Sequence, residues 1–143
     1  MRAKITFATL FVYAAGVIAI TALPIHRRPA GYWAGEPWWT MFRWIPGDVD
    51  APSFVLNVIM FIPCGVLLPL LWRPADDSRR LALVAVTASA SIEVLQFVLG
   101  ITLGSRRTVD VNDLIANTAG ALIGLAILRL ALPVAAHRRL IRP

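Results

Sequence analysis

Four long apolar segments most constrain what this chain can fold into. They cover residues 5–23, 53–72, 81–103 and 111 to about 132. As α-helices rising 1.5 Å per residue, segments of about 20 residues are long enough to cross a hydrocarbon core of roughly 30 Å. Only 15% of the 143 residues are charged, whereas soluble domains carry about 25%. The sequence therefore predicts one all-α domain over 1–143, a polytopic membrane bundle of about four transmembrane helices.

The first apolar segment has an alternative interpretation as a cleaved secretory signal peptide, because Arg2 and Lys4 precede it. A cleavage site would require small residues near Ala19 or Ala22, and the fit at those positions is loose. We therefore expect residues 5–23 to be retained as the first transmembrane helix.

Prolines and glycines predict local features of two other helices. Pro63 and Pro69 each remove a backbone donor, which predicts that the helix over 53–72 is kinked or partly broken. Gly120 and Gly124 are four residues apart, a spacing of small residues that lets another helix approach closely.

The one long connection, over residues 24–52, is rich in aromatic residues. Tryptophan prefers the headgroup level of a membrane, where its ring is buried and its N–H stays hydrated. We expect this Trp-rich loop to lie on the membrane in short interfacial helices, and the alternative is a loop folded into the bundle. Its tryptophans are Trp33, Trp38, Trp39 and Trp44.

The positive charges predict the orientation of the bundle. With four spans, both termini lie on the same side as the 73–80 connection. That side holds Arg2, Lys4, Arg73, Arg79, Arg80, Arg138, Arg139 and Arg142, against Arg27, Arg28, Arg43, Arg106 and Arg107 on the other. The excess of positive charge predicts that both termini are cytoplasmic. These arginines lie in connections, where they can contact lipid phosphates, so we expect no nucleic-acid partner for this chain of net charge +6.

Polar side chains interrupt the third apolar segment on one face. A carboxylate inside a membrane costs roughly 2.5–3.5 kcal/mol on insertion scales, so Glu93 should face the bundle and find a partner. Ser89, Glu93, Gln96 and Gly100 follow a helical period and form one stripe.

The fourth segment begins with a second polar stripe, at Asp110, Asp113 and Asn117. A helix N-cap would account for Asp110 alone, but not for the two residues deeper in the segment. Arg106 and Arg107 stand just before it, in a turn predicted to face outward. Cys64 is the sole cysteine, so no internal disulfide forms, and no metal or cofactor motif is present.

These polar residues should converge if the helices alternate in direction. Asn57 lies about one turn into the outer end of the second span, level with the two stripes. We expect one cluster in the middle to outer half of the membrane. Its side chains either pair with one another through hydrogen bonds and ion pairs or form a pocket. Its members are Asn57, Glu93, Gln96, Asp113 and Asn117, beneath Arg106 and Arg107.

Three blocks of the chain resemble the VanZ-like family of bacterial membrane proteins. They are NVIMFIPCG at 57–65, SIEVLQ at 91–96 and RTVDVNDLIANTAG at 107–120, together spanning about 53–125. The resemblance implies a bacterial cytoplasmic membrane protein linked to low-level resistance to the glycopeptide teicoplanin. It also implies a role for Asn57, Glu93, Gln96, Arg107, Asp110, Asp113 and Asn117. Family members tend to have an acid where this chain has Asn112.

We rank a binding protein first among the functions that fit these residues. Its pocket, open to the outer leaflet, would hold a membrane lipid, a lipid-linked cell-wall intermediate or a glycopeptide antibiotic. Arg106 and Arg107 would hold a phosphate or carboxylate, and Glu93 with Gln96 would bond the polar head. Trp38, Trp39 and Trp44 would line the entrance from the lipid.

Two alternatives follow. A membrane enzyme would use Glu93 as general acid or base on a lipid headgroup, with Asp110 and Asp113 as a second pair or as ligands of a divalent cation. Against it, no nucleophile stands beside a base, and His26 and His137 lie outside the cluster. A transporter or flippase would use the same intramembrane acids, but so short a chain would need to oligomerise.

Overall fold

The computed structural model describes residues 2–23, 35–103 and 108–132, and its main elements are four long helices. These are α1 (Arg2–Ala22), α2 (Ala51–Leu71), α3 (Ser78–Leu103) and α4 (Val111–Ala131). Each is long and apolar enough to cross a membrane. The predicted all-α bundle of four transmembrane helices is therefore confirmed.

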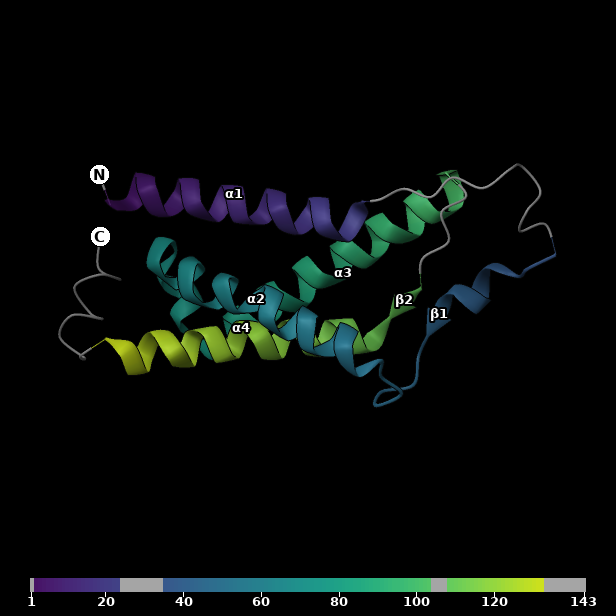
Figure 1. Cartoon of the computed structure of the whole chain (residues 1–143). Coiled ribbons are helices and arrows are strands. Elements are labelled where there is room, and N and C mark those ends of the chain that lie inside the picture. Colours follow the sequence, from purple (N-terminus) through teal and green to yellow (C-terminus); the bar gives the residue numbers. More distant parts are fainter. Residues whose placement is uncertain (1, 24–34, 104–107, 133–143) are drawn as a thin grey trace.

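Successive helices run in opposite directions (Figure 1), so α1 and α3 end where α2 and α4 begin. The most extensive contact joins α2 to α4, α3 packs mainly against α4, and α1 lies against α2 and α3. A small core of buried residues holds the bundle together, while the outward faces remain apolar and exposed, as expected of a protein solvated by lipid. The core residues are Phe61, Ala75, Leu81, Ala85, Ala121 and Leu125.

Glycines let the backbones of α2 and α4 touch. A Cβ atom on Gly120 would overlap the backbone oxygen of Val58, and one on Gly124 would overlap that of Ile62. A Cβ atom on Gly65 would likewise overlap the backbone of α4. The close helix approach predicted from Gly120 and Gly124 is confirmed, and Gly65 is its counterpart on the facing helix.

The prolines of α2 do not break it. The helix continues through Pro63 and Pro69 as far as Leu71, so the expected partial break is wrong, while the alternative of a kink stays a prediction. Each proline removes only one backbone hydrogen bond, and the neighbouring bonds with the packing against α4 keep the segment helical. Beside the first proline, the hydroxyl of Tyr13 on α1 donates to the carbonyl oxygen of Met60 at 2.6 Å.

The described part of the Trp-rich loop packs against the end of the bundle. It forms a 3₁₀ helix, Trp38–Met41, followed by β1 (Phe42–Arg43), which pairs in parallel with β2 (Val109–Asp110) just before α4. These two short strands were not predicted. Met41 is buried, and the ring of Phe42 lies 5.2 Å from that of Phe97 on α3.

The described tryptophans of this loop lie on its outer side, where Trp44 stacks on Phe42 and Trp38 meets the same ring edge-on. Trp38, Trp39 and Trp44 are all exposed, and Trp33 lies outside the described residues. Met41 and Phe42 fold onto the bundle, as the second interpretation of the loop expects, and the interfacial position of the tryptophans stays a prediction. An exposed tryptophan at the end of a membrane helix bundle is well placed for the headgroup region.

Candidate functional site

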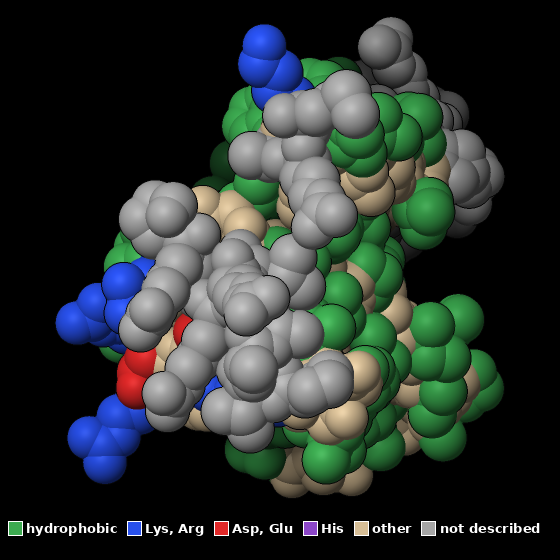
Figure 2. Space-filling view, turned by 90° about the vertical axis from the view of Figure 1, so that its left-hand side faces the viewer, with side chains coloured by type: hydrophobic (Ala, Val, Ile, Leu, Met, Phe, Trp, Pro, Cys, Tyr) green, Lys and Arg blue, Asp and Glu red, His purple; other side chains and the backbone are tan. Residues whose placement is uncertain are grey.

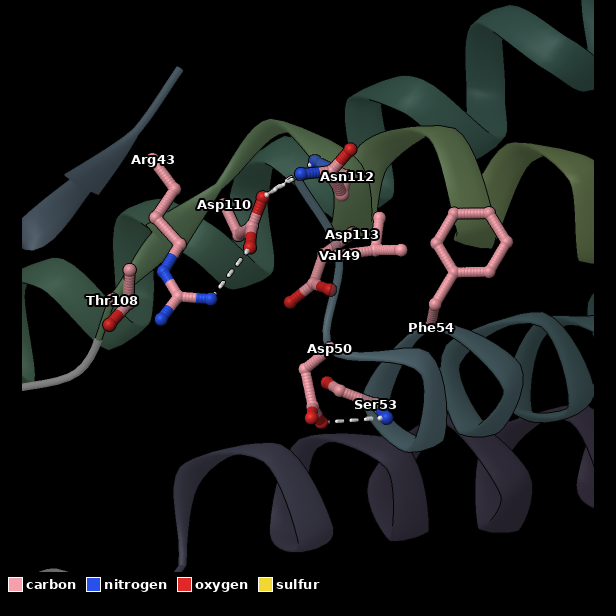
Figure 3. A pocket seen from close by; sticks show the side chains of 9 residues that line it. All are labelled: Arg43, Val49, Asp50, Ser53, Phe54, Thr108, Asp110, Asn112 and Asp113. Atoms are coloured by element: carbon pink, nitrogen blue, oxygen red, sulfur yellow. Dashed lines mark hydrogen bonds and ion pairs between the residues drawn. The ribbon is translucent and has the colours of Figure 1, made fainter. Parts of the chain in front are cut away.

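A polar pocket lies where α2 and α4 begin and where β1 meets β2 (Figure 3). Its volume is about 220 Å³. Three of its residues are aspartates, one is an arginine, and Val49 and Phe54 supply apolar surface. The lining residues are Arg43, Val49, Asp50, Ser53, Phe54, Thr108, Asp110, Asn112 and Asp113.

Asp110 stands at the centre of the pocket wall. Its side chain caps α4 by accepting from the backbone N–H of Asn112 at 2.8 Å. The register of the two strands sets Arg43 directly opposite Asp110, and Arg43 Nη1 lies 4.0 Å from Asp110 Oδ2. Capping therefore accounts for part of the role of Asp110, and the same carboxylate also positions the pocket's guanidinium.

Asp113 ties the pocket to α2. The side-chain amide of Asn57 donates to Asp113 Oδ1 at 2.6 Å, joining two helices 56 residues apart in sequence. Asp50 begins α2 in the same way that Asp110 begins α4, because its carboxylate accepts from the backbone N–H of Ser53 at 3.1 Å. The first turns of two helices thus direct acids toward one space (Figure 3).

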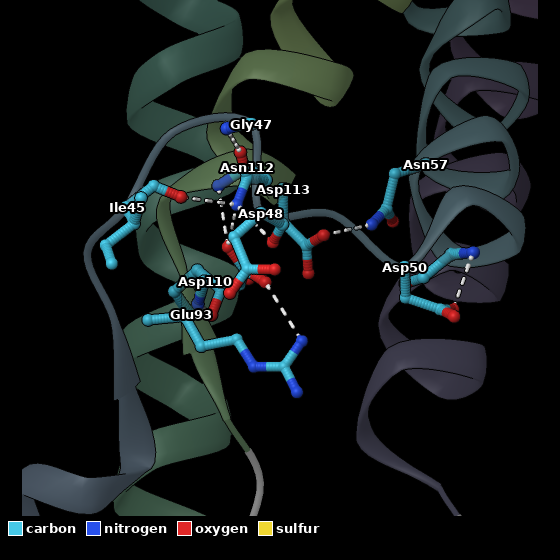
Figure 4. A network of polar contacts seen from close by, with 11 residues as sticks. Ile45, Gly47, Asp48, Asp50, Asn57, Glu93, Asp110, Asn112 and Asp113 are labelled. Atoms are coloured by element: carbon cyan, nitrogen blue, oxygen red, sulfur yellow. Dashed lines mark hydrogen bonds and ion pairs between the residues drawn. The ribbon is translucent and has the colours of Figure 1, made fainter.

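Asn112 fixes the loop that closes this end of the bundle (Figure 4). Its side chain is 3% exposed, and its Nδ2 donates to the backbone oxygens of Ile45 at 3.2 Å and Asp48 at 3.3 Å. Its Oδ1 accepts from the N–H of Gly47 at 2.8 Å, where the backbone φ of +92° favours glycine. An acid has no N–H groups to make the first two bonds.

Glu93 does not line the pocket but contacts the backbone of Asp110, which does. It is 4% exposed, and its Oε2 accepts from the backbone N–H of Asp110 at 3.2 Å. Its carboxyl also interacts with that of Asp113. This places Glu93 beside the two predicted aspartates while shielding it from a ligand in the cavity.

Two other predicted residues point elsewhere. Asn117 lies one turn deeper in α4, 3% exposed, and its Nδ2 donates to the hydroxyl of the buried Ser89 at 2.8 Å. Gln96 donates to the carbonyl oxygen of Thr21 at 3.1 Å, which ties α3 to the end of α1. Both join helices, as the internal-pairing alternative expects.

The structure brings together Asn57, Glu93, Asp110 and Asp113, while Arg106 and Arg107 lie outside the described residues. Sequence reasoning missed Arg43, Asp50 and Asn112. The only signal for Arg43 was its outward position in the Trp-rich loop, where it was counted for orientation alone. For Asn112 the signal was its position between Asp110 and Asp113 in the third resembling block.

The described pocket offers a ligand several hydrogen-bond acceptors and one cationic group. Asp50, Asp110 and Asp113 accept hydrogen bonds when ionised, and Arg43 donates. Within 2–23, 35–103 and 108–132, no group of three or more histidine, cysteine or acidic residues is arranged to hold a metal ion. A ligand with hydroxyl or amino groups and one anionic group fits this set of side chains.

Comparison with known proteins places the chain in a family. The VanZ/LLP1 family profile matches residues 10–132. Protein VanZ of Enterococcus faecium is 36% identical over 69 residues, which cover 48% of this chain and 39% of that protein. The alignment thus spans well under half the length of this curated relative, and no solved structure matches the chain. With most of its length matched by the profile, the chain belongs to the VanZ/LLP1 family.

Proposed function

We propose that the pocket binds the polar head of an amphiphilic or lipid-linked cell-envelope molecule, whose apolar part lies in the bilayer beside the helices. The observation that carries this proposal is the ion pair of Arg43 with Asp110, set among carboxylates where the membrane-crossing segments α2 and α4 begin. A polar site at the end of two such helices is reached both from the water and from the lipid.

The side chains define which headgroups suit the pocket. Arg43 is 52% exposed in its side chain, so its guanidinium has exposed N–H groups beyond its ion pair with Asp110, and these can bind a phosphate or carboxylate through two parallel hydrogen bonds. Asp50 and Asp113 accept hydrogen bonds from hydroxyl or ammonium groups. Lipid-linked cell-wall intermediates and lipoglycopeptides such as teicoplanin carry both kinds of group, which agrees with the resistance associated with VanZ-like proteins.

We further propose that the protein resides in the bacterial cytoplasmic membrane with both termini cytoplasmic, so that the pocket faces outward. The excess of positive residues on the side of the termini supports this orientation. Envelope intermediates and glycopeptides are met on the outer face, where the pocket would then lie.

A binding role explains the position of Glu93 better than an enzymatic one. A general acid or base must come within hydrogen-bond reach of the reacting group, about 2.6–3.2 Å. Glu93 is 4% exposed and bonded to the backbone of Asp110, so it is placed to hold the pocket wall. Turnover of a headgroup substrate that is lost in Glu93→Gln would support the enzyme alternative instead.

The experiment is to identify, by mass, the lipids and glycolipids that co-purify with the protein and with two pocket variants, Arg43→Gln and Asp113→Asn. We expect the wild type to retain an envelope amphiphile enriched over bulk phospholipid, and both variants to lose it. Lys4→Gln, at the opposite end of the bundle and outside both pockets, removes the same charge as Arg43→Gln and should retain the ligand.

Binding of teicoplanin to the same four proteins in detergent, measured by calorimetry, tests the antibiotic directly. Folded pocket variants that keep the wild-type ligand, or a wild type without any enriched ligand and without teicoplanin binding, would overturn the proposal.

A further inference from the structure

The opposite end of the bundle carries a second, basic site. An open groove of about 690 Å³ lies between the α2–α3 connection and the last turn of α4. Figure 2 views this end of the molecule and shows Lys and Arg side chains around a small acidic patch. The groove is lined by Arg73, Pro74, Asp76, Asp77, Ser78, Arg79, Arg80 and Arg129.

The connection that carries these arginines is well ordered by its own bonds. It forms a 3₁₀ helix, Arg73–Asp76, in which Ala75 is fully buried against the core. Arg129 of α4 reaches across to it, donating to the backbone oxygen of Asp76 and, at 3.2 Å, to the hydroxyl of Ser78. The groove is therefore built from two elements held in a fixed relation.

The two acids of the groove bond to other residues, whereas three of its four arginines form no ion pair with any residue that the structure describes. Asp76 pairs with Arg129 at 3.5 Å, and the carboxylate of Asp77 accepts from the backbone N–H of Arg80 at 3.0 Å. Within the part of the chain that the structure describes, Arg73, Arg79 and Arg80 form no ion pair. Their side chains are exposed, so this end of the protein has guanidinium groups available for an anion.

The position of the groove indicates which anion. Arg73 follows α2 within two residues of its end at Leu71, and Arg79 and Arg80 lie in the first turn of α3. Trp72, between α2 and the groove, is 46% exposed, as is common at the headgroup level. The guanidiniums thus stand where lipid phosphates lie, and arginine binds phosphate with two parallel hydrogen bonds.

We propose that this groove is a binding site for the headgroup of an anionic phospholipid, with Arg73, Arg79 and Arg80 holding its phosphate. The site is separate from the pocket around Arg43 and does not depend on the function proposed for it. Arginines that served orientation alone would attract anionic lipid only diffusely, so the loss of any positive charge at this end of the bundle would lower the preference equally.

The test measures the phosphatidylglycerol and phosphatidylcholine retained by the full chain purified from an equimolar mixture in neutral detergent. We expect a clear preference for phosphatidylglycerol. Near an anionic lipid surface each arginine contributes about fivefold in affinity, so Arg73→Gln, Arg79→Gln and Arg80→Gln should each lower the preference by about that factor. Lys4→Gln, which removes the same charge at the same end of the bundle but outside the groove, should leave it unchanged.

Three results would overturn this assignment. One is equal retention of both lipids by the wild type, and another is an equal loss of preference in Lys4→Gln, which would indicate a net-charge effect. The third is binding of inorganic phosphate, followed by phosphorus NMR in detergent without lipid, as tight as that of the phospholipid. The conservative triple variant with lysine at positions 73, 79 and 80 controls for folding, and it should keep part of the preference since it keeps the charge.

Discussion

The side chain of Asn112 and the backbone of Gly47 are joined by a 2.8 Å hydrogen bond, although 65 residues separate them. Through this bond and two more to Ile45 and Asp48, one amide at the start of α4 holds the loop that follows β1. Because β1 carries Arg43, the amide also positions the guanidinium of the pocket. The geometry of the pocket therefore depends on the buried Asn112, whose side-chain amide hydrogen-bonds to the backbone of the loop that follows β1.

Replacing Asn112 by aspartate should release this loop. The aspartate cannot donate hydrogen bonds to the backbone oxygens of Ile45 and Asp48. It also places a second carboxylate beside that of Asp110, where the amide of Asn112 donates a hydrogen bond. Leaving buried polar groups unsatisfied costs about 1–3 kcal/mol, so thermal stability in detergent should fall. Amide exchange at Gly47 and Asp48, measured by mass spectrometry, should become faster in Asn112→Asp while α2 is unaffected, because the loop is then held only through the bond that the carboxylate still accepts from the Gly47 N–H. Unchanged protection at both positions would show that the loop is held by other contacts.

The close packing of α2 on α4 makes Gly120 and Gly124 intolerant of side chains. Gly120→Val or Gly124→Val would force apart two backbones, and overpacking costs about 1–3 kcal/mol even where side chains can adjust. We expect a loss of stability at or above the top of that range, read from unfolding of the purified protein in increasing SDS. Gly16→Val is the matched control, because nothing lies within 4 Å of its Cβ position. Equal unfolding curves for the variants and the control would contradict the helix contact.

The bond from Asn57 to Asp113 should matter more for ligand binding than for stability. Side-chain hydrogen bonds between membrane helices contribute on average about 0.6 kcal/mol and at most about 1.7 kcal/mol. Asn57→Leu should therefore remain folded but lose the co-purifying ligand, because Asp113 is no longer held toward the pocket. Ser91→Ala should lose neither property, because among the described residues the Ser91 hydroxyl bonds only within its own helix. If Asn57→Leu kept the ligand, the bond would serve only to join the helices.

Labelling of single cysteines tests the orientation. In a Cys64→Ser background, Ser53→Cys marks the pocket end and Ser78→Cys marks the arginine groove, and both serines are exposed. A membrane-impermeant maleimide added to intact cells should label Ser53→Cys, and it should reach Ser78→Cys only after permeabilisation. The reverse pattern would place the termini outside and turn the pocket toward the cytoplasm.

The sequence by itself determined the helices and the level of the polar residues. Length and hydropathy are local properties of a segment, so four apolar stretches of about 20 residues define four spans whatever their packing. Alternation in direction then brought Asn57, Glu93, Asp110 and Asp113 to one end, as observed. The glycine pair predicted a close helix contact for the same reason, since small side chains are a property of one helix face.

Only the tertiary structure decided which residues surround the pocket and what each polar group bonds. A stripe of polar residues does not specify its partner, so Gln96 turned to α1 and Asn117 to Ser89. Arg43 reached the pocket because two segments about 65 residues apart pair as short strands, and no local pattern in either one predicts that pairing. Asn112 likewise took its role from backbone groups of a distant loop, which need partners once they are buried.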